Sequence, residues 1–147
     1  MTKEQTEKLQ DYLEGLLGVN NTDTPPVGAV LVEENIHDKV LDFMVDKKMH
    51  IFNNSSDNML ENNLEKLSSS IEKGQAVVID SGVELSPVLN NLFLDFIHGK
   101  LSFNIPGKGQ KVINPVSGKT KAVFVLTKDL FDNSDRFSKV VSSVCRL

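Results

Sequence analysis

One stretch decides the fold of this 147-residue chain: Ala76-Val77-Val78-Ile79-Asp80. An uninterrupted apolar run that is rich in β-branched residues is typical of a strand buried on both faces. The stretch follows Lys73-Gly74, which ends a helical pattern, and precedes Ser86-Pro87, which begins another. Serine caps a helix and proline suits its first turn. A buried strand between two helices predicts a parallel sheet covered by helices.

The same alternation continues on both sides of this strand. Further strands are expected at residues 29–32, 49–52, 122–126 and 140–145. For the last of these, a short helix from Ser134 is the alternative. Helical faces are expected from Asn35 to Val45, from Asn58 to Ile71 and from Ser86 to Gly99. We expect the strand that ends at Asp80 to be central in the sheet and the strand around Ile51 to lie nearer an edge.

Residues 101–114 follow a different pattern. Leu101, Phe103 and Ile105 alternate with polar residues, a turn follows at 106–109, and Lys111-Val112-Ile113 returns. This pattern predicts a β-hairpin. The predicted fold is therefore α/β: a three-layer parallel sheet with helices on both faces and an inserted hairpin.

The first 18 residues are expected to form an appended helix. Thr2 and Gln5 have the spacing of a capping box, and Gly18 supplies a stop. Residues 19–26, which end in Pro25-Pro26, are a linker, and residues 27–147 form the α/β domain. One helix face is apolar, and its members are Leu9, Leu13, Leu16 and Leu17. We interpret this face as a docking element for a protein partner; the alternative is that it folds back on its own domain.

Composition excludes several classes of protein. Sixteen basic against twenty acidic residues give a net charge of −4, which argues against a nucleic-acid partner. The single cysteine, Cys145, cannot form an internal disulfide or a thiolate zinc site. No apolar stretch is long enough for a signal peptide or a membrane span, so we expect a cytoplasmic protein.

Two places invite a nucleotide-binding interpretation, and neither has the residues for it. Ser117-Gly118-Lys119-Thr120 resembles the end of a phosphate-binding loop, but Ile113 stands where its first glycine is needed and a strand follows. After the first strand the chain has Glu33-Glu34, whose carboxylates would repel a phosphate. We predict neither a nucleotide nor any other cofactor.

Catalytic and metal-binding patterns are also missing from the sequence. Asp80 lies where a nucleotide hydrolase would hold Mg²⁺, yet Ser81 follows it instead of a second acid, and we favour a role in capping the next turn. His37, His50 and His98 lack the spacing of metal ligands. We therefore predict no catalytic residue and no metal.

Basic residues gather in the second half of the chain. They are Lys100, Lys108, Lys111, Lys119, Lys121 and Lys128. We interpret them as solubilising charge on an exposed turn, and the alternative is a docking surface for an acidic partner.

The order of these elements resembles an AAA+ module around its Walker B strand. More narrowly, it is similar to the nucleotide-free fifth AAA+ module of dynein heavy chains. The spacing of Gly74 to Asp80 and of Glu84-Leu85-Ser86-Pro87-Val88-Leu89 matches that family, as do the hairpin, Leu126-Thr127-Lys128 and Lys139-Val140-Val141. Ser86 stands where the family has an acid, and Asn133-Ser134-Asp135 departs from its usual motif.

The resemblance covers residues 27–147 and implies a degenerate AAA+ module rather than a motor. It implies a non-catalytic interaction or structural role, in a cytoplasmic setting that extends to the cytoskeleton or cilium. The alternative is a regulatory subunit of an ATPase assembly, in which Arg136 would act in trans on the nucleotide of another protein. The identity of a protein partner and the oligomeric state are not predicted.

Overall fold

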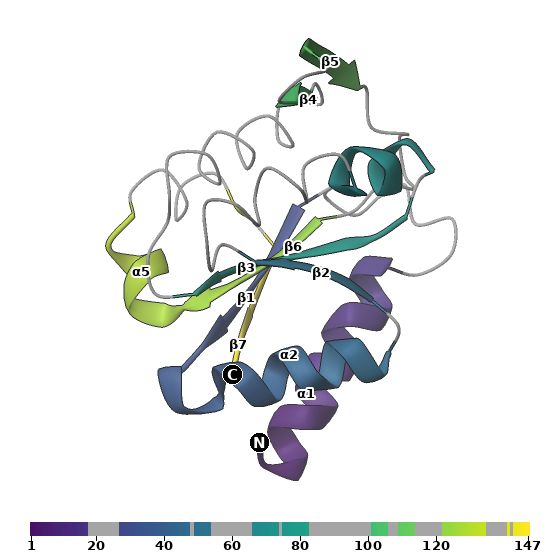
Figure 1. Ribbon diagram of the computed structural model, residues 1–147. Coiled ribbons are helices and arrows are strands. Elements are labelled where there is room, and N and C mark those ends of the chain that lie inside the picture. Colours follow the sequence, from purple (N-terminus) through teal and green to yellow (C-terminus); the bar gives the residue numbers. More distant parts are fainter. Residues whose placement is uncertain are drawn as a thin grey trace.

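A five-stranded parallel sheet forms the centre of the molecule (Figure 1). The computed structural model describes residues 1–17, 27–47, 49–53, 66–73, 75–82, 101–105, 109–113, 122–134, 141 and 143–147. The sheet has the order β2-β3-β6-β1-β7, and every neighbouring pair is parallel. Its strands are β1 (Val27–Val32), β2 (His50–Asn53), β3 (Val77–Gly82), β6 (Ala122–Thr127) and β7 (Val144–Arg146). The predicted α/β fold class is confirmed.

The apolar strands supply two separate cores, because successive side chains point to opposite faces of a sheet. On β1, Val27, Ala29 and Leu31 belong to one buried cluster, whereas Val30 and Val32 belong to the other. The strands β3 and β6 divide in the same way. A strand buried on both faces needs no polar alternation, which explains the continuous apolar runs.

Helices cover both faces of the sheet (Figure 1). On one face, the helical residues 66–72 and the short helix α5 (Lys128–Asp132) contribute Leu67, Ile71 and Phe131 to the core around Phe124. On the other face lie the 3₁₀ turn η1 (Glu34–Ile36), the helix α2 (His37–Asp46) and the helix α1 (Lys3–Leu17). The molecule therefore has three layers.

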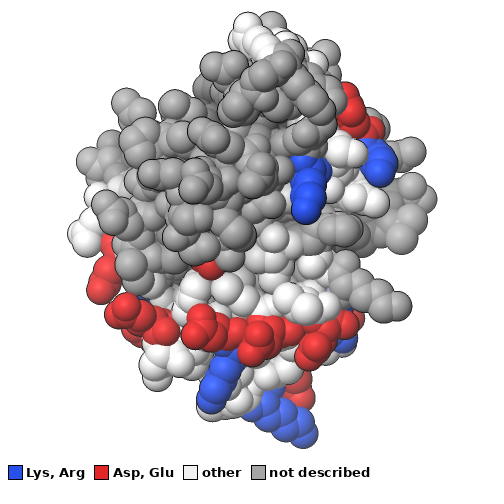
Figure 2. Space-filling model, viewed as in Figure 1, with Lys and Arg blue, Asp and Glu red and all other residues white. Residues whose placement is uncertain are grey.

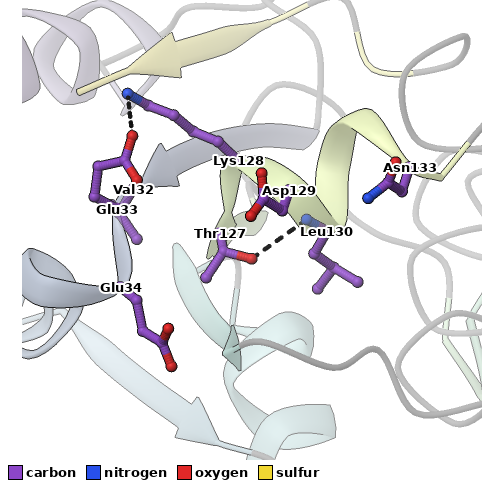
Figure 3. A pocket seen from close by; sticks show the side chains of 8 residues that line it. All are labelled: Val32, Glu33, Glu34, Thr127, Lys128, Asp129, Leu130 and Asn133. Atoms are coloured by element: carbon purple, nitrogen blue, oxygen red, sulfur yellow. Dashed lines mark hydrogen bonds and ion pairs between the residues drawn. The ribbon is translucent and has the colours of Figure 1, made fainter.

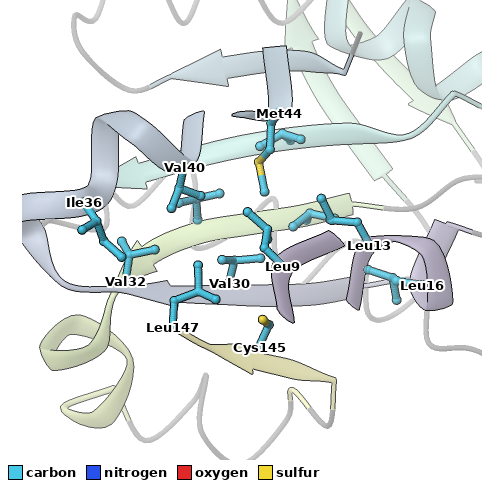
Figure 4. Close-up of a cluster of buried hydrophobic side chains, with 13 residues drawn as sticks. Leu9, Leu13, Leu16, Val30, Val32, Ile36, Val40, Met44, Cys145 and Leu147 are labelled. Atoms are coloured by element: carbon cyan, nitrogen blue, oxygen red, sulfur yellow. The ribbon is translucent and has the colours of Figure 1, made fainter. Parts of the chain in front are cut away.

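The helix α1 begins with the predicted capping box. The backbone N–H of Gln5 donates to Thr2 Oγ1 at 3.1 Å, and the backbone N–H of Thr2 donates to Gln5 Oε1 at 3.0 Å. Its leucines Leu9, Leu13 and Leu16 are buried on the sheet, in the cluster that also holds Cys145 (Figure 4). The structure corrects the interpretation of these three as a free docking face, since α1 is part of the helix layer. The side chain of Leu17 and the linker 19–26 lie outside the described residues.

A glycine in β1 allows α1 to approach closely. A Cβ at Gly28 would lie 2.7 Å from Leu16 Cδ2 and even closer to Tyr12 Oη. The Tyr12 hydroxyl lies 3.0 Å from the backbone oxygen of Ser143, to which it donates. Ser143 in turn accepts from the backbone N–H of Ala29, so that α1 is attached where β1 and the segment before β7 meet.

The predicted hairpin is present and forms a sheet of its own. β4 (Leu101–Ile105) and β5 (Gly109–Ile113) are antiparallel, with Leu101 opposite Ile113. Gly109, the first residue of β5, has a φ of 82°, which glycine adopts without steric cost. In Figure 1 the hairpin stands on the side of the sheet away from α1 and α2.

Several sequence-based expectations differ from the structure in detail. β6 is the central strand, and β3, which carries Asp80, lies between it and the edge strand β2. Asn35 does not cap α2, because it belongs to η1, and α2 begins at His37 without a side-chain cap. The predicted helix after Ser86 lies outside the described residues. Among the residues described, no helix has the length and apolar character needed to cross a membrane.

Candidate functional site

The carboxyl ends of β1, β3 and β6 bring polar residues to one edge of the sheet. Glu33 follows β1, Asp80 lies near the end of β3, and Thr127 ends β6. In open parallel sheets this edge is where ligands bind, because loops and helix N-termini meet there. This edge is therefore the candidate binding site of the molecule.

His37 and Asp80 form the closest polar contact at this edge. His37 Nε2 lies 2.6 Å from Asp80 Oδ1, and the two side chains are only 18% and 13% exposed. The distance fits an imidazole N–H that donates to the carboxylate. Asp80 has a further interaction of its own. The contact ties the start of α2 to the end of β3.

The other ring nitrogen of His37 faces an exposed acid. Its Nδ1 lies 3.3 Å from Asp38 Oδ1, and the Asp38 side chain is almost fully in solvent. The imidazole therefore lies between two carboxylates. An aspartate that is held in this way serves to fix α2 on the sheet.

At the same edge of the sheet, a pocket of about 420 Å³ opens between the ends of β1 and β6 (Figure 3). Its lining consists of Val32, Glu33, Glu34, Thr127, Lys128, Asp129, Leu130 and Asn133. Glu33 and Lys128 approach each other across it, with 3.1 Å between Glu33 Oε1 and Lys128 Nζ. Thr127 caps α5 by accepting the backbone N–H of Leu130 at 3.3 Å.

The lining of this pocket is acidic. The Lys128 ammonium is paired with Glu33, whereas Glu34 and Asp129 keep exposed carboxylates at the same edge. A phosphate would have to displace the Lys128–Glu33 pair and approach three acids, at a Coulombic cost. Within the described part of the chain, no group of three or more His, Cys, Asp or Glu side chains could hold a metal ion.

The remaining residues singled out from the sequence fall into two groups. Cys145 is free and buried, and His50 lies in β2. The motif at residues 117–120, His98 and Arg136 lie outside the described residues, as do Ser86 and Lys139-Val140-Val141 apart from Val141.

Sequence reasoning missed the His37–Asp80 contact and the helix α5. Asp80 was expected to cap the following turn, and the structure gives it His37 as a partner. A signal for the pair was present, because His37 and Asp80 each follow an apolar strand and parallel strands end at the same edge. The signal for α5 was Thr127, a good capping residue with an acid in the turn that follows.

No known protein-family model matches the chain, and no curated protein matches its sequence. Among solved structures, a mutant form of RuvB from Thermotoga maritima matches with a TM-score of 0.50 and 14% sequence identity. The match covers 97% of this chain, which spans 46% of that RuvB chain. The fold is AAA+-like.

The likeness in fold allows the residues at this edge to be compared with those at the same edge of nucleotide hydrolases. RuvB is an AAA+ ATPase, and in P-loop nucleotide hydrolases the loop after the first strand cradles phosphate. In this chain the loop after β1 holds Glu33-Glu34 and then His37, which contacts Asp80.

Proposed function

We propose that this chain is a non-catalytic AAA+-like module that acts through protein–protein contacts and does not hydrolyse ATP. The observation that carries the proposal is the 2.6 Å contact between His37 and Asp80. In P-loop hydrolases an aspartate after a buried strand and a hydroxyl of the phosphate-binding loop hold Mg²⁺ together. Here an imidazole from the segment after β1 is bonded to that aspartate.

Two further observations support the proposal. Glu33 and Glu34 replace the glycines whose backbone N–H groups would approach a phosphate, and Lys128 is paired with Glu33. The sequence also resembles the fifth AAA+ module of dynein heavy chains, which lacks a nucleotide. That narrower relationship would extend the setting of this module to the cytoskeleton or cilium.

The proposal is tested by phosphate release from Mg-ATP. The wild-type chain and an Asp80→Asn variant are expected to match the buffer background equally. Turnover by the wild type that Asp80→Asn abolishes would overturn the proposal.

A second variant separates a structural from a catalytic role of the pair. His37→Ala leaves the Asp80 carboxylate without its imidazole, which is expected to cost about 1–3 kcal/mol of unfolding free energy. The expected result is a lower urea midpoint with no change in phosphate release. An His37→Ala variant of unchanged stability would contradict the structural role.

A further inference from the structure

The strand β7 is a short edge strand that contacts the helix layers on both faces of the sheet. It has three residues and pairs with β1, and the described part of the chain places no strand on its other side. Before it, the backbone N–H of Ala29 donates to the oxygen of Ser143 at 3.0 Å. After it, the backbone N–H of Leu147 donates to the oxygen of Leu31, also at 3.0 Å. We call residues 143–147 the β7 strap.

One face of the β7 strap lies under α1. Successive side chains alternate across a sheet, so Cys145 and Leu147 point to the same face. Both are buried, and they share a cluster with Leu9 of α1 (Figure 4). At the start of the strap, the backbone oxygen of Ser143 accepts the hydroxyl of Tyr12 at 3.0 Å. The helix α1 therefore holds the strap by apolar packing and by a hydrogen bond.

The other face of the β7 strap holds α5. Arg146 points away from its neighbour Cys145, and its Nη2 lies 2.8 Å from Asp132 Oδ1. The guanidinium also lies over the Phe131 ring, 5.7 Å from the ring centroid. Arg146 thus contacts both the last residue of α5 and the residue by which α5 enters the core.

Ion pairs connect α5 to its surroundings on two sides. Figure 2 shows acidic side chains in a band across the described surface, with basic side chains beside it. The pairs of α5 join separate elements: Arg146 reaches α5 from β7, and Lys128 of α5 reaches Glu33 beyond β1 at 3.1 Å. Lys128, Asp129 and Leu130 also line the pocket at the carboxyl edge. The position of α5 therefore sets the position of one wall of this pocket.

We infer that the β7 strap is a conformational latch that couples α1, on one face of the sheet, to α5 and the pocket at its carboxyl edge. The strap has two states, docked on β1 or released, and a three-residue edge strand opens more easily than the strands inside the sheet. The contacts of Tyr12 and of Arg146 both require the docked strap, so each of them favours that state. By linkage, an event that lifts α1 loosens α5, and anything that fixes α5 strengthens the hold on α1. The coupling is independent of whether the chain hydrolyses ATP.

The rate at which Cys145 reacts with a neutral thiol reagent under native conditions tests the coupling from α5 towards α1. Cys145 is buried on the α1 face, whereas Arg146 contacts α5 on the other face. Arg146→Ala is expected to speed the reaction about threefold to tenfold, because the lost ion pair and the lost contact with the Phe131 ring both favour the released strap. Asp132→Ala leaves the strap sequence intact and should change the rate in the same direction.

Hydrogen exchange of α5 tests the coupling in the opposite direction. Tyr12→Phe removes the hydroxyl that donates to Ser143 and leaves every residue of the strap and of α5 in place. The amides of α5 are expected to exchange about fivefold faster, which is the effect of losing one ordinary hydrogen bond from the docked state. Mass spectrometry of the exchanged peptides measures this change.

A control variant separates strap release from global unfolding. Phe52 lies on β2, at the opposite edge of the described sheet, and packs against the core around Phe124. Phe52→Ala should lower the urea midpoint and leave both the Cys145 and the α5 rates at their wild-type values. Circular dichroism verifies that every variant is folded.

Three results would overturn the inference. They are an Arg146→Ala variant whose Cys145 reacts at the wild-type rate, a Tyr12→Phe variant whose α5 amides keep their wild-type protection, and a Phe52→Ala variant that speeds both readouts as much as the strap variants do. The last result would mean that the thiol and the α5 amides become accessible only when the whole molecule unfolds.

Discussion

Gly28 is the residue at which the backbone of β1 meets the first helix. A methyl group there would collide with Leu16 and with the Tyr12 hydroxyl. We predict that Gly28→Ala lowers the free energy of unfolding by about 1–3 kcal/mol, the usual cost of overpacking. Urea denaturation followed by circular dichroism measures the change.

A second glycine provides the control. Gly15 is exposed in α1, and an added Cβ would meet nothing within 4 Å. Gly15→Ala should raise the stability by up to about 1 kcal/mol, because alanine is the better helix former. Equal effects of the two substitutions would contradict the close packing of α1 on β1.

Tyr12 is the one tyrosine of the chain, so its ionisation can be followed by absorbance without interference. Burial raises the pKa of the Tyr12 phenol above its ordinary value of 10.0, and the hydrogen bonds with Ser143 and the Ala29 backbone offset part of that rise. The Tyr12 phenol therefore ionises at a lower pH in the unfolded chain than in the folded protein. Stability that is complete below about pH 10 is expected to decline as the pH rises through the folded pKa.

An absorbance titration of the folded protein tests this prediction. The midpoint should lie above that of the same chain in denaturant. In Tyr12→Phe this contribution to the alkaline loss of stability should disappear. A folded midpoint at or below the denatured one would contradict the burial of the phenol.

At the scale of elements, α1 behaves as part of the core. Leu13 is buried beside Leu9 in the cluster that holds Cys145, and burial raises the pKa of the Cys145 thiol. Leu13→Asp would bury a charge, and we predict that it lowers the melting temperature by about 10 °C. It should also speed the reaction of Cys145 with a thiol reagent, since α1 then detaches.

The exposed neighbour Asp11 supplies the comparison for this helix. Asp11→Ala should leave both the melting temperature and the reactivity of Cys145 close to those of the wild type. If Leu13→Asp melts like the wild type and keeps Cys145 unreactive, then α1 is not held on the sheet in solution.

Elements defined by local signals could be predicted from the sequence. The capping box needs only Thr2 and Gln5, three residues apart, and the hairpin needs only the alternation and turn of residues 101–114. The His37–Asp80 contact joins residues 43 positions apart, and nothing local specifies it. The sequence also could not specify the surface on which the α1 leucines pack, because an apolar helix face does not reveal which surface buries it.

At the scale of the whole molecule, the order of the strands was harder to predict than their existence. Each apolar run indicates a buried strand. Which strands lie next to it depends on the crossover connections and on the packing of the two helix layers. The sequence suggested that the strand of Asp80 is central, and the structure places β6 there, between β1 and β3. The apolar run of β6 is as continuous as that of β3, so composition does not separate them.

The strand order leads to a prediction for amide hydrogen exchange of the whole molecule. β6 has a hydrogen-bonded neighbour on each side, and all of its residues are buried from both faces. β1 is equally buried and lies between β6 and β7, whereas β2 is at an edge of the described sheet. Since exchange from the core requires global unfolding, the amides of β6 and β1 are expected to exchange most slowly.

The hairpin of β4 and β5 should exchange fastest among the strands, because it forms a two-stranded sheet apart from the main one. Mass spectrometry of peptides from the exchanged protein resolves these regions. Protection of β4 and β5 equal to that of β6 would mean that the hairpin is covered.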